Sequence, residues 1–113
     1  MDAHDTPLKA NRFQVLLALS EGPLHGFAIR EVVEERTNGG MILWPATLYG
    51  VLRDLAEVGW IAELEGAEAP DDDARRKYYE LTPDGRGRLL DEARRLEGWA
   101  AAARAGLRPE ESG

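Results

Sequence analysis

One segment of the chain constrains the fold most, residues 44–61, which read WPATLYGVLRDLAEVGWI. Its apolar side chains follow the i, i+3, i+4, i+7 spacing of a helix with one buried stripe. They are Leu48, Val51, Leu52 and Leu55. The opposite side carries small, hydroxyl-bearing and charged residues, namely Thr47, Tyr49, Gly50, Arg53 and Asp54. We therefore expect an amphipathic helix whose polar side is free for another task.

Two more helices are expected before this segment. Thr6 and Pro7 suit an N-cap and a first helical residue, so the first helix should run from about Pro7 to Ser20. The second should start near His25 and bury a stripe of alanine, isoleucine and valine. It should end at residues 38–40, Asn-Gly-Gly, which tolerate positive φ. Three helices so closely spaced predict a compact helical core.

After Gly59 the pattern changes from helical spacing to strand alternation. In the first predicted strand, Trp60, Ala62 and Leu64 alternate with Ile61, Glu63 and Glu65. Residues 66–74 read GAEAPDDDA, a composition typical of a turn. In the returning strand, Lys77, Tyr79 and Leu81 alternate with Arg76, Tyr78 and Glu80. The region is predicted to be a β-hairpin with a polar tip.

A long helix is expected from Thr82-Pro83-Asp84, which combines a hydroxyl cap, a proline at the first helical position and an acid near the positive helix end. Its apolar residues are spaced alternately by four and three, as in a coiled-coil seam. They are Leu89, Ala93, Leu96, Ala100, Ala103 and Leu107. A helix of this length beside so small a core is best explained by a second copy of the chain, so we expect a homodimer.

These elements predict a mainly α fold with a small β-hairpin wing, that is, a winged helix-turn-helix followed by a C-terminal dimerisation helix. We expect the winged helix-turn-helix domain over residues 1–82, the dimerisation helix over 83–108 and a flexible tail over 109–113. A helix with an exposed polar side, followed by a hairpin, suits placement of side chains in the DNA major groove. The predicted partner is a double-stranded DNA operator.

Composition narrows the function further. The chain of 113 residues has no cysteine and two histidines, which argues against disulfides, thiol catalysis and a histidine metal cluster. We find no phosphate-binding glycine loop and no serine with a histidine–acid partner, so neither an enzyme nor a cofactor is expected. No apolar run approaches the roughly 18 residues of a membrane span, and the start lacks a signal peptide. A cytoplasmic protein without membrane contact is predicted.

Three side chains of the polar helix side are predicted to contact DNA: Thr47, Tyr49 and Arg53. Arginine can bind guanine through two hydrogen bonds, and hydroxyls suit phosphates or base edges. Structural alternatives are that Tyr49 packs against the first helix and that Arg53 pairs with Asp54 or Glu57. Gly50 is explained by close approach of DNA or another helix, or by drift.

The wing offers Arg75, Arg76 and Lys77 as phosphate or minor-groove contacts, or as charges that balance the aspartates at 71–73. Three roles are open for His25: it caps the second helix, it contacts a DNA phosphate, or it is an exposed residue without a function. The net charge of −7 opposes bulk attraction to DNA and predicts that specificity depends on geometry. It also leaves open a second function, a winged-helix protein-interaction module that does not bind DNA.

Trp99 lies beside the seam of the last helix. In a dimer, two such indoles could sandwich a small aromatic effector, or they could simply pack at the interface.

Four ordered motifs resemble the PadR family of bacterial winged-helix transcriptional regulators, in its short form with one C-terminal helix. They are LLALSEGPLHGFAI at 16–29, PATLYGVLRDL at 45–55, GWI at 59–61 and RRKYYELTPDG at 75–85. The resemblance implies a homodimer, usually a repressor, that binds palindromic operators through the third helix and the wing. It also implies that the last helix makes the dimer with help from the first, including Phe13. Phe27 departs from the usual tyrosine of the HGY motif, and Arg53 replaces a frequent lysine.

Overall fold

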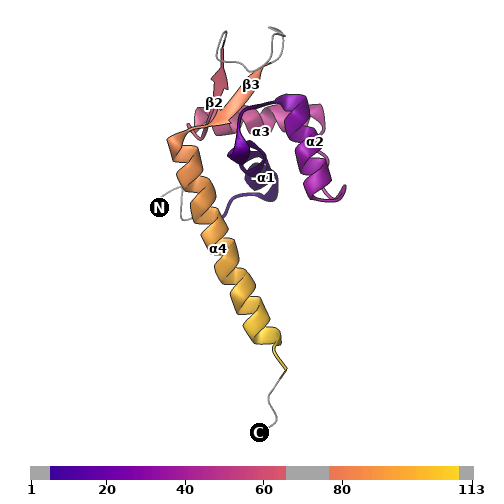
Figure 1. Cartoon of the computed structure of the whole chain (residues 1–113), viewed down its shortest axis with the longest axis vertical. Helices are drawn as coiled ribbons and strands as arrows, with labels where there is room; N and C mark the ends of the chain where they lie inside the picture. The colour runs from indigo at the N-terminus through magenta and orange to yellow at the C-terminus, as the bar shows by residue number, and fades with distance from the viewer. Residues whose placement is uncertain (1–5, 66–76, 110–113) are drawn as a thin grey trace.

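A computed structural model describes residues 6–65 and 77–109 of the chain. Three helices and a small sheet form a body from which one long helix extends (Figure 1). The elements in chain order are α1 (Ala10–Ala18), the 3-10 turn η2 (Leu19–Glu21), β1 (Leu24–His25), α2 (Gly26–Arg36), α3 (Pro45–Glu57), β2 (Ile61–Leu64), β3 (Tyr78–Leu81) and α4 (Pro83–Leu107). The predicted mainly α fold with a small hairpin is confirmed.

The core lies between α1, α2, α3 and the sheet. The apolar stripe predicted for α3 is confirmed, because Leu48, Val51, Leu52 and Leu55 are all buried. They pack in one cluster with buried residues of the other elements, including Val15, Leu16, Leu19, Ile29, Val33, Leu43, Ile61 and Leu81. Since one side of α3 is held by this cluster, its other side is fixed in a defined direction.

The start predicted for the first helix is wrong. Helix α1 begins at Ala10, and its N-cap residue Lys9 makes no side-chain capping bond. Thr6 is not a cap, because the segment before α1 lies against α4 instead. The guanidinium of Arg88 donates to the carbonyl oxygen of Thr6, and the Leu8 amide donates to Oε2 of Glu92 at 3.2 Å. These contacts satisfy the backbone that the predicted first turn would have used.

The predicted hairpin is present but belongs to a three-stranded antiparallel sheet of order β1-β3-β2. Strand β3 pairs with β2 in the register Ile61↔Leu81 and Leu64↔Tyr78. The unpredicted strand β1 pairs with its other edge through Leu24↔Tyr79 and His25↔Tyr78. This pairing explains why Tyr78 and Tyr79 are both buried, whereas strand alternation predicted opposite environments. The turn predicted over 66–74, Arg75 and Arg76, and most of the tail predicted over 109–113 lie outside the described residues.

The ends of α2 and α3 follow the predicted signals. His25 caps α2, with Nδ1 accepting from the Ala28 amide at 3.2 Å. Asn38 and Gly39 adopt positive φ after this helix, at 52° and 79°, and Gly59 does so after α3, at 87°. The sharp turn at Gly59 directs the chain from α3 into β2.

The predicted start of α4 is also confirmed, and the structure adds its tertiary anchor. Thr82 caps the helix by accepting from the Gly85 amide at 3.0 Å, and its hydroxyl donates to the Gly59 carbonyl at 2.6 Å. A Cβ on Gly85 would lie 1.9 Å from the backbone oxygen of Trp60. Glycine at this position therefore lets α4 begin directly against the end of the α3–β2 turn.

Candidate nucleic-acid interface

The polar side of α3 forms an exposed surface, as the sequence predicts. Thr47, Tyr49 and Arg53 are all exposed, while the opposite stripe of the helix is buried. Asp54 does not pair with Arg53; its Oδ2 accepts from Nη2 of Arg12 on α1 at 2.7 Å. Within the described chain the Arg53 guanidinium has no hydrogen bond or ion pair. It is thus available to bind an acceptor outside the molecule.

Tyr49 is held on one side and exposed on the other. Its hydroxyl lies 3.2 Å from the position that a Cβ on Gly26 would take, so it packs on the start of α2. About half of the side chain is accessible, with an exposed fraction of 54%. A Cβ on Gly50 would meet no described atom within 4 Å, which excludes close approach of another described helix as the reason for glycine. The tyrosine is positioned by α2 and still able to contact a ligand.

A cavity of about 390 Å³ adjoins this surface between α3 and the sheet. Its lining combines Tyr49, Leu52, Arg53, Ala56, Glu57, Glu63 and Tyr79. Burial raises the pKa of the Tyr79 hydroxyl above 10.0, with smaller contributions from Glu63 and Tyr49. Tyr79 therefore remains a neutral hydroxyl at physiological pH, and the two glutamates make this edge of the surface unfavourable for phosphate.

Two of the remaining predicted DNA contacts, His25 and Lys77, lie in or next to strands of the sheet. His25 has the capping role, and its ring packs against the Tyr78 ring in a T-shaped arrangement with a centroid distance of 5.3 Å. Lys77 is exposed immediately before β3. Arg75 and Arg76 are outside the described residues, so the structure places only the last of the three wing cations.

Two exposed aromatic residues near α3 were not predicted from the sequence. Phe27 in the first turn of α2 and Trp44 just before α3 are each 59% exposed. The Arg30 guanidinium lies 4.8 Å from the centre of the Trp44 ring, a cation–π distance. Trp44 provides no side-chain cap for α3, so the first amides of this helix are left for an external acceptor. The sequence could have indicated this uncapped helix end, because Trp44 occupies the N-cap position, where a residue with a side-chain oxygen is usual.

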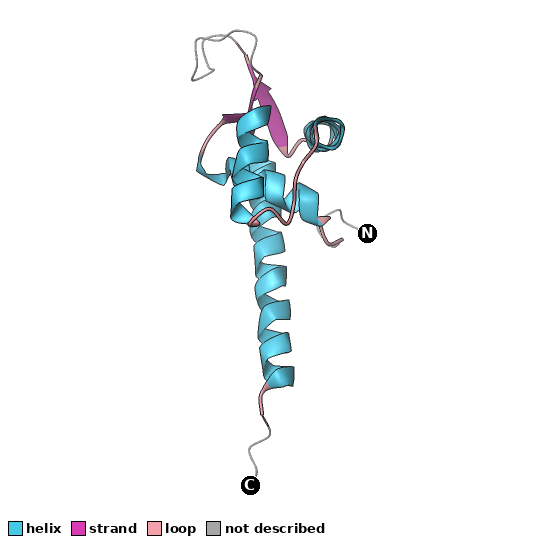
Figure 2. Ribbon diagram, turned by 90° about the vertical axis from the view of Figure 1, so that its right-hand side faces the viewer, coloured by secondary structure: helices cyan, strands magenta, loops and turns pink. Residues whose placement is uncertain are grey.

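The residues predicted for the dimer fall into two groups. Phe13, Leu89 and Ala93 line one groove of about 290 Å³ between α1 and α4, together with Leu17, Ser20, Leu81, Arg86 and Leu90. Leu96, Ala100 and Ala103 lie on the part of α4 that extends from the body, where nearly every residue is exposed (Figure 2). Trp99 is also there, with an exposed fraction of 55%.

Residues 6–65 and 77–109 contain no helix long and apolar enough to cross a membrane. In the same ranges there is no group of three or more histidine, aspartate or glutamate side chains that could hold a metal ion.

Helices α2 and α3 are followed by the β2–β3 hairpin, and α3 has an exposed polar side. This arrangement, followed by the long helix α4, defines a winged helix-turn-helix protein. The chain belongs to the Transcriptional regulator PadR-like family, whose sequence pattern matches residues 15–91. This confirms the family resemblance, and the family consists of transcriptional regulators and not of enzymes.

Solved structures share this fold, and one known protein is similar in sequence over part of its length. A transcriptional regulator from Clostridium thermocellum is 20% identical, with a TM-score of 0.71 over 89% of this chain and 99% of that chain. Bacillus subtilis PadR, solved in complex with operator DNA, is 24% identical, with a TM-score of 0.61 over 75% of this chain and 47% of that one. An uncharacterised 37.1 kDa protein in transposon TN4556 of Streptomyces fradiae is 39% identical over 79 residues. The match covers 70% of this chain and 21% of that protein, so the chain spans about a fifth of this relative's length.

Proposed function

We propose that the chain is a homodimeric repressor that binds a palindromic DNA operator with α3 in the major groove and the hairpin alongside. The observation that carries this proposal is the guanidinium of Arg53, which has no partner within the described chain and lies on the exposed side of a helix whose other side is buried. Arginine in this setting can read guanine O6 and N7. Such a role places the protein beside the chromosome, in the cytoplasm.

Thr47 and Tyr49 complete the proposed reading surface, and His25, Arg75, Arg76 and Lys77 are proposed to contact the backbone. Because the chain has a net charge of −7, we expect it to make few contacts to DNA phosphates. Its affinity for DNA should therefore depend less on salt concentration than that of a typical DNA-binding protein. The uncapped N-terminus of α3 supplies part of the missing positive potential.

The proposed dimer buries the groove between α1 and α4 and the exposed seam of α4. Phe13, Leu89 and Ala93 would contact the partner at the groove, and Leu96, Ala100 and Ala103 would do so along the extended part. Leu96 and Leu107 are large apolar side chains exposed on this helix, which a second copy would cover. Two-fold symmetry would then set the two α3 helices about 34 Å apart, one turn of DNA.

Trp99 is proposed as a contact for a small aromatic effector that releases the operator. Its exposed indole beside the seam would approach the partner's copy, so the pair could stack a flat ring. Titration of an aromatic panel should quench Trp99 emission and lower DNA affinity. Unchanged emission across a chemically varied panel would contradict this part of the proposal.

Fluorescence anisotropy with DNA fragments from around the protein's own promoter tests the central claim. Arg53→Ala should reduce discrimination between operator and non-operator DNA by about 1–3 kcal/mol, whereas Lys77→Ala should weaken all sequences similarly. Arg104→Ala, an exposed cation far along α4, is the matched control and should change neither. Absence of sequence-selective binding to these fragments would refute the proposal. A stoichiometric protein partner whose binding survives Arg53→Ala would instead support an interaction module.

A further inference from the structure

Two charged side chains, Arg88 and Glu92, are buried near the start of α4. They lie one turn apart on the helix and are 1% and 2% exposed. Nη1 of Arg88 and Oε1 of Glu92 form an ion pair at 3.2 Å, and the same oxygen accepts from the more exposed Arg95 at 2.8 Å. Among the residues that the structure describes, no other charged side chain is buried. Charged residues are rarely buried, so this pair calls for an explanation.

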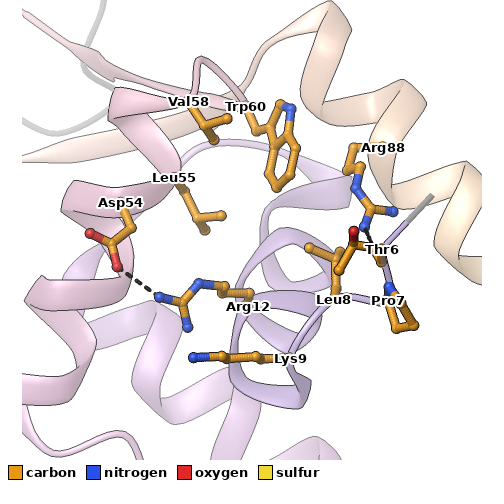
Figure 3. A pocket seen from close by; sticks show the side chains of 10 residues that line it. All are labelled: Thr6, Pro7, Leu8, Lys9, Arg12, Asp54, Leu55, Val58, Trp60 and Arg88. Carbon is orange, nitrogen blue, oxygen red and sulfur yellow. Dashed lines mark hydrogen bonds and ion pairs between the residues drawn. The ribbon is translucent and has the colours of Figure 1, made fainter. Parts of the chain in front are cut away.

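Segments from elsewhere in the sequence cover the pair. The Arg88 guanidinium donates to the Thr6 carbonyl (Figure 3), and the Leu8 amide donates to Oε2 of Glu92 at 3.2 Å. The indole of Trp60, between α3 and β2, also lies against Arg88, with 5.3 Å between the guanidinium carbon and the ring centre. The two charges therefore join α4 to the segment before α1 and to the turn that follows α3.

Close apolar packing does not hold α4 at this point. A cavity of about 310 Å³ remains between the segment before α1, the end of α3 and the start of α4 (Figure 3). Lys9 and Arg12 line it together with Trp60 and Arg88. Because this space is not filled by side chains, the hydrogen bonds of the buried pair are the contacts that fix α4 here.

A separate group of contacts holds the first turn of α4. The Thr82 amide donates to the Trp60 carbonyl at 3.1 Å, and the Thr82 hydroxyl donates to the Gly59 carbonyl at 2.6 Å. Gly85 lies so close to the Trp60 carbonyl that a Cβ would overlap it. These contacts fix where α4 begins, but a helix attached only at its end can still change direction.

The direction matters because α4 is long. At a rise of about 1.5 Å per residue, Glu92 lies about 15 Å and Leu107 about 37 Å from Thr82. A change of about 10° in the direction of α4 would move its far end by about 6 Å, nearly two base-pair steps of about 3.4 Å. A second attachment at Arg88 and Glu92 prevents such a change.

The pair is not the most stable way to fill this position. Nε of Arg88 is buried and makes no hydrogen bond within the described residues. A buried donor without an acceptor is costly, and apolar side chains of similar volume often replace a buried ion pair without loss of stability. What the ion pair adds is direction, because hydrogen bonds specify one geometry where apolar contacts allow several.

We propose that Arg88 and Glu92 are positioning residues that set the spacing between the two half-sites of the operator. By fixing the direction of α4 relative to the turn after α3, they fix the distance between the two α3 helices of a dimer formed through α4. This inference rests on the proposed function. Neither residue is required to touch DNA.

The direction of α4 can be measured without DNA, by electron paramagnetic resonance. The chain has no cysteine, so Glu57→Cys at the end of α3 and Arg104→Cys far along α4 provide two sites for spin labels. An excess of unlabelled chain confines the measured distance to one copy. Adding Arg88→Met and Glu92→Leu should make the distance distribution about twofold broader, because the directional contacts are lost. Arg94→Gln with Glu97→Gln removes two exposed charges of the same helix and is the matched control, which should leave the distribution unchanged.

Operator spacing is measured by fluorescence anisotropy on the same proteins without labels. One or two base pairs are inserted or removed between the half-sites, and each moves a half-site by about 3.4 Å and turns it by about 35°. We expect one base pair to lower the affinity of the wild type by about tenfold and that of the Arg88→Met, Glu92→Leu variant by less than about threefold. A merely structural role would lower affinity equally at every spacing, and that result would overturn the proposal.

Circular dichroism shows whether the double variant folds. If it does not, Glu92→Gln takes its place, since it removes the counter-charge and keeps an acceptor for the Leu8 amide. An unchanged distance distribution in the folded variant would overturn the positioning role, and an unchanged spacing profile would overturn the link to the operator. If the wild-type chain binds no DNA, the proposed function fails, and the distance measurement still decides whether Arg88 and Glu92 hold α4.

Discussion

Replacing Glu92 by alanine is expected to lower the free energy of unfolding by about 3–5 kcal/mol, because it leaves a buried guanidinium without its counter-charge. Glu92 is 2% exposed, and its carboxylate accepts from three donors. These are Nη1 of Arg88 at 3.2 Å, Nη1 of Arg95 at 2.8 Å and the Leu8 amide at 3.2 Å. The substitution would thus remove the hydrogen-bond acceptor of the segment before α1 and also leave Arg88 without its counter-charge. The expected loss of stability is therefore in the upper part of the range for single substitutions.

Thermal unfolding followed by circular dichroism at fixed protein concentration measures this effect. For a chain of this size, 3–5 kcal/mol corresponds to a decrease in Tm of roughly 10–20 °C. Glu97→Ala, an exposed acid on the same helix, is the control and should stay within about 0.5 kcal/mol of the wild type. The pair Arg88→Met and Glu92→Leu should recover much of the loss, since apolar residues of similar volume need no counter-charge. Glu92→Ala within about 1 kcal/mol of wild type would refute the reasoning.

Further predictions concern glycines and one tyrosine. Gly85→Ala should destabilise the fold by several kcal/mol in chemical denaturation, because its Cβ would overlap the Trp60 backbone oxygen, whereas Gly87→Ala, with open space around it, should stabilise α4 by about 0.5–1 kcal/mol. Gly50→Ala should likewise stabilise the isolated protein by about 0.5–1 kcal/mol but weaken operator binding if DNA approaches this helix closely; unchanged anisotropy would exclude that approach. Burial raises the pKa of Tyr79, so the stability it contributes is present below pH 10.0 and is lost as the pH rises through its folded-state pKa. The free energy of unfolding of Tyr79→Phe should therefore fall less than that of the wild type above pH 10.0. The same dependence on pH in both proteins would contradict the role given to Tyr79.

Local signals were sufficient for most of the helices. The apolar spacing within α3, the positive φ at Gly59 and the Thr82 cap of α4 each depend on residues within about two helical turns, where capping and periodicity act. The exposed side of α3 could be predicted for the same reason, since burying one stripe of a helix leaves the other side outward.

Elements that depend on distant partners were missed. Strand β1 has two residues, too few for any alternation, and exists because β3 offers it a free edge. Thr6 is a residue type that commonly caps helices, but here its carbonyl accepts a hydrogen bond from Arg88, 82 positions away. Helix α1 therefore starts later, at Ala10. The sequence offered Asp54 as an alternative partner for Arg53 on the same helix, but Asp54 pairs with Arg12 on α1.

The sequence by itself determined the order of the helices, the strands of the hairpin, the division of α3 into a core side and a free side, and the family. Only the tertiary structure decided that Arg88 and Glu92 are buried, although an i, i+4 pair of opposite charges on a helix is ordinarily a surface pair. It also decided that the cations before and within α1 meet Trp60 at a cavity. The physical reason is that propensity and capping act over a few residues, whereas burial of a charge depends on which distant segment packs over it.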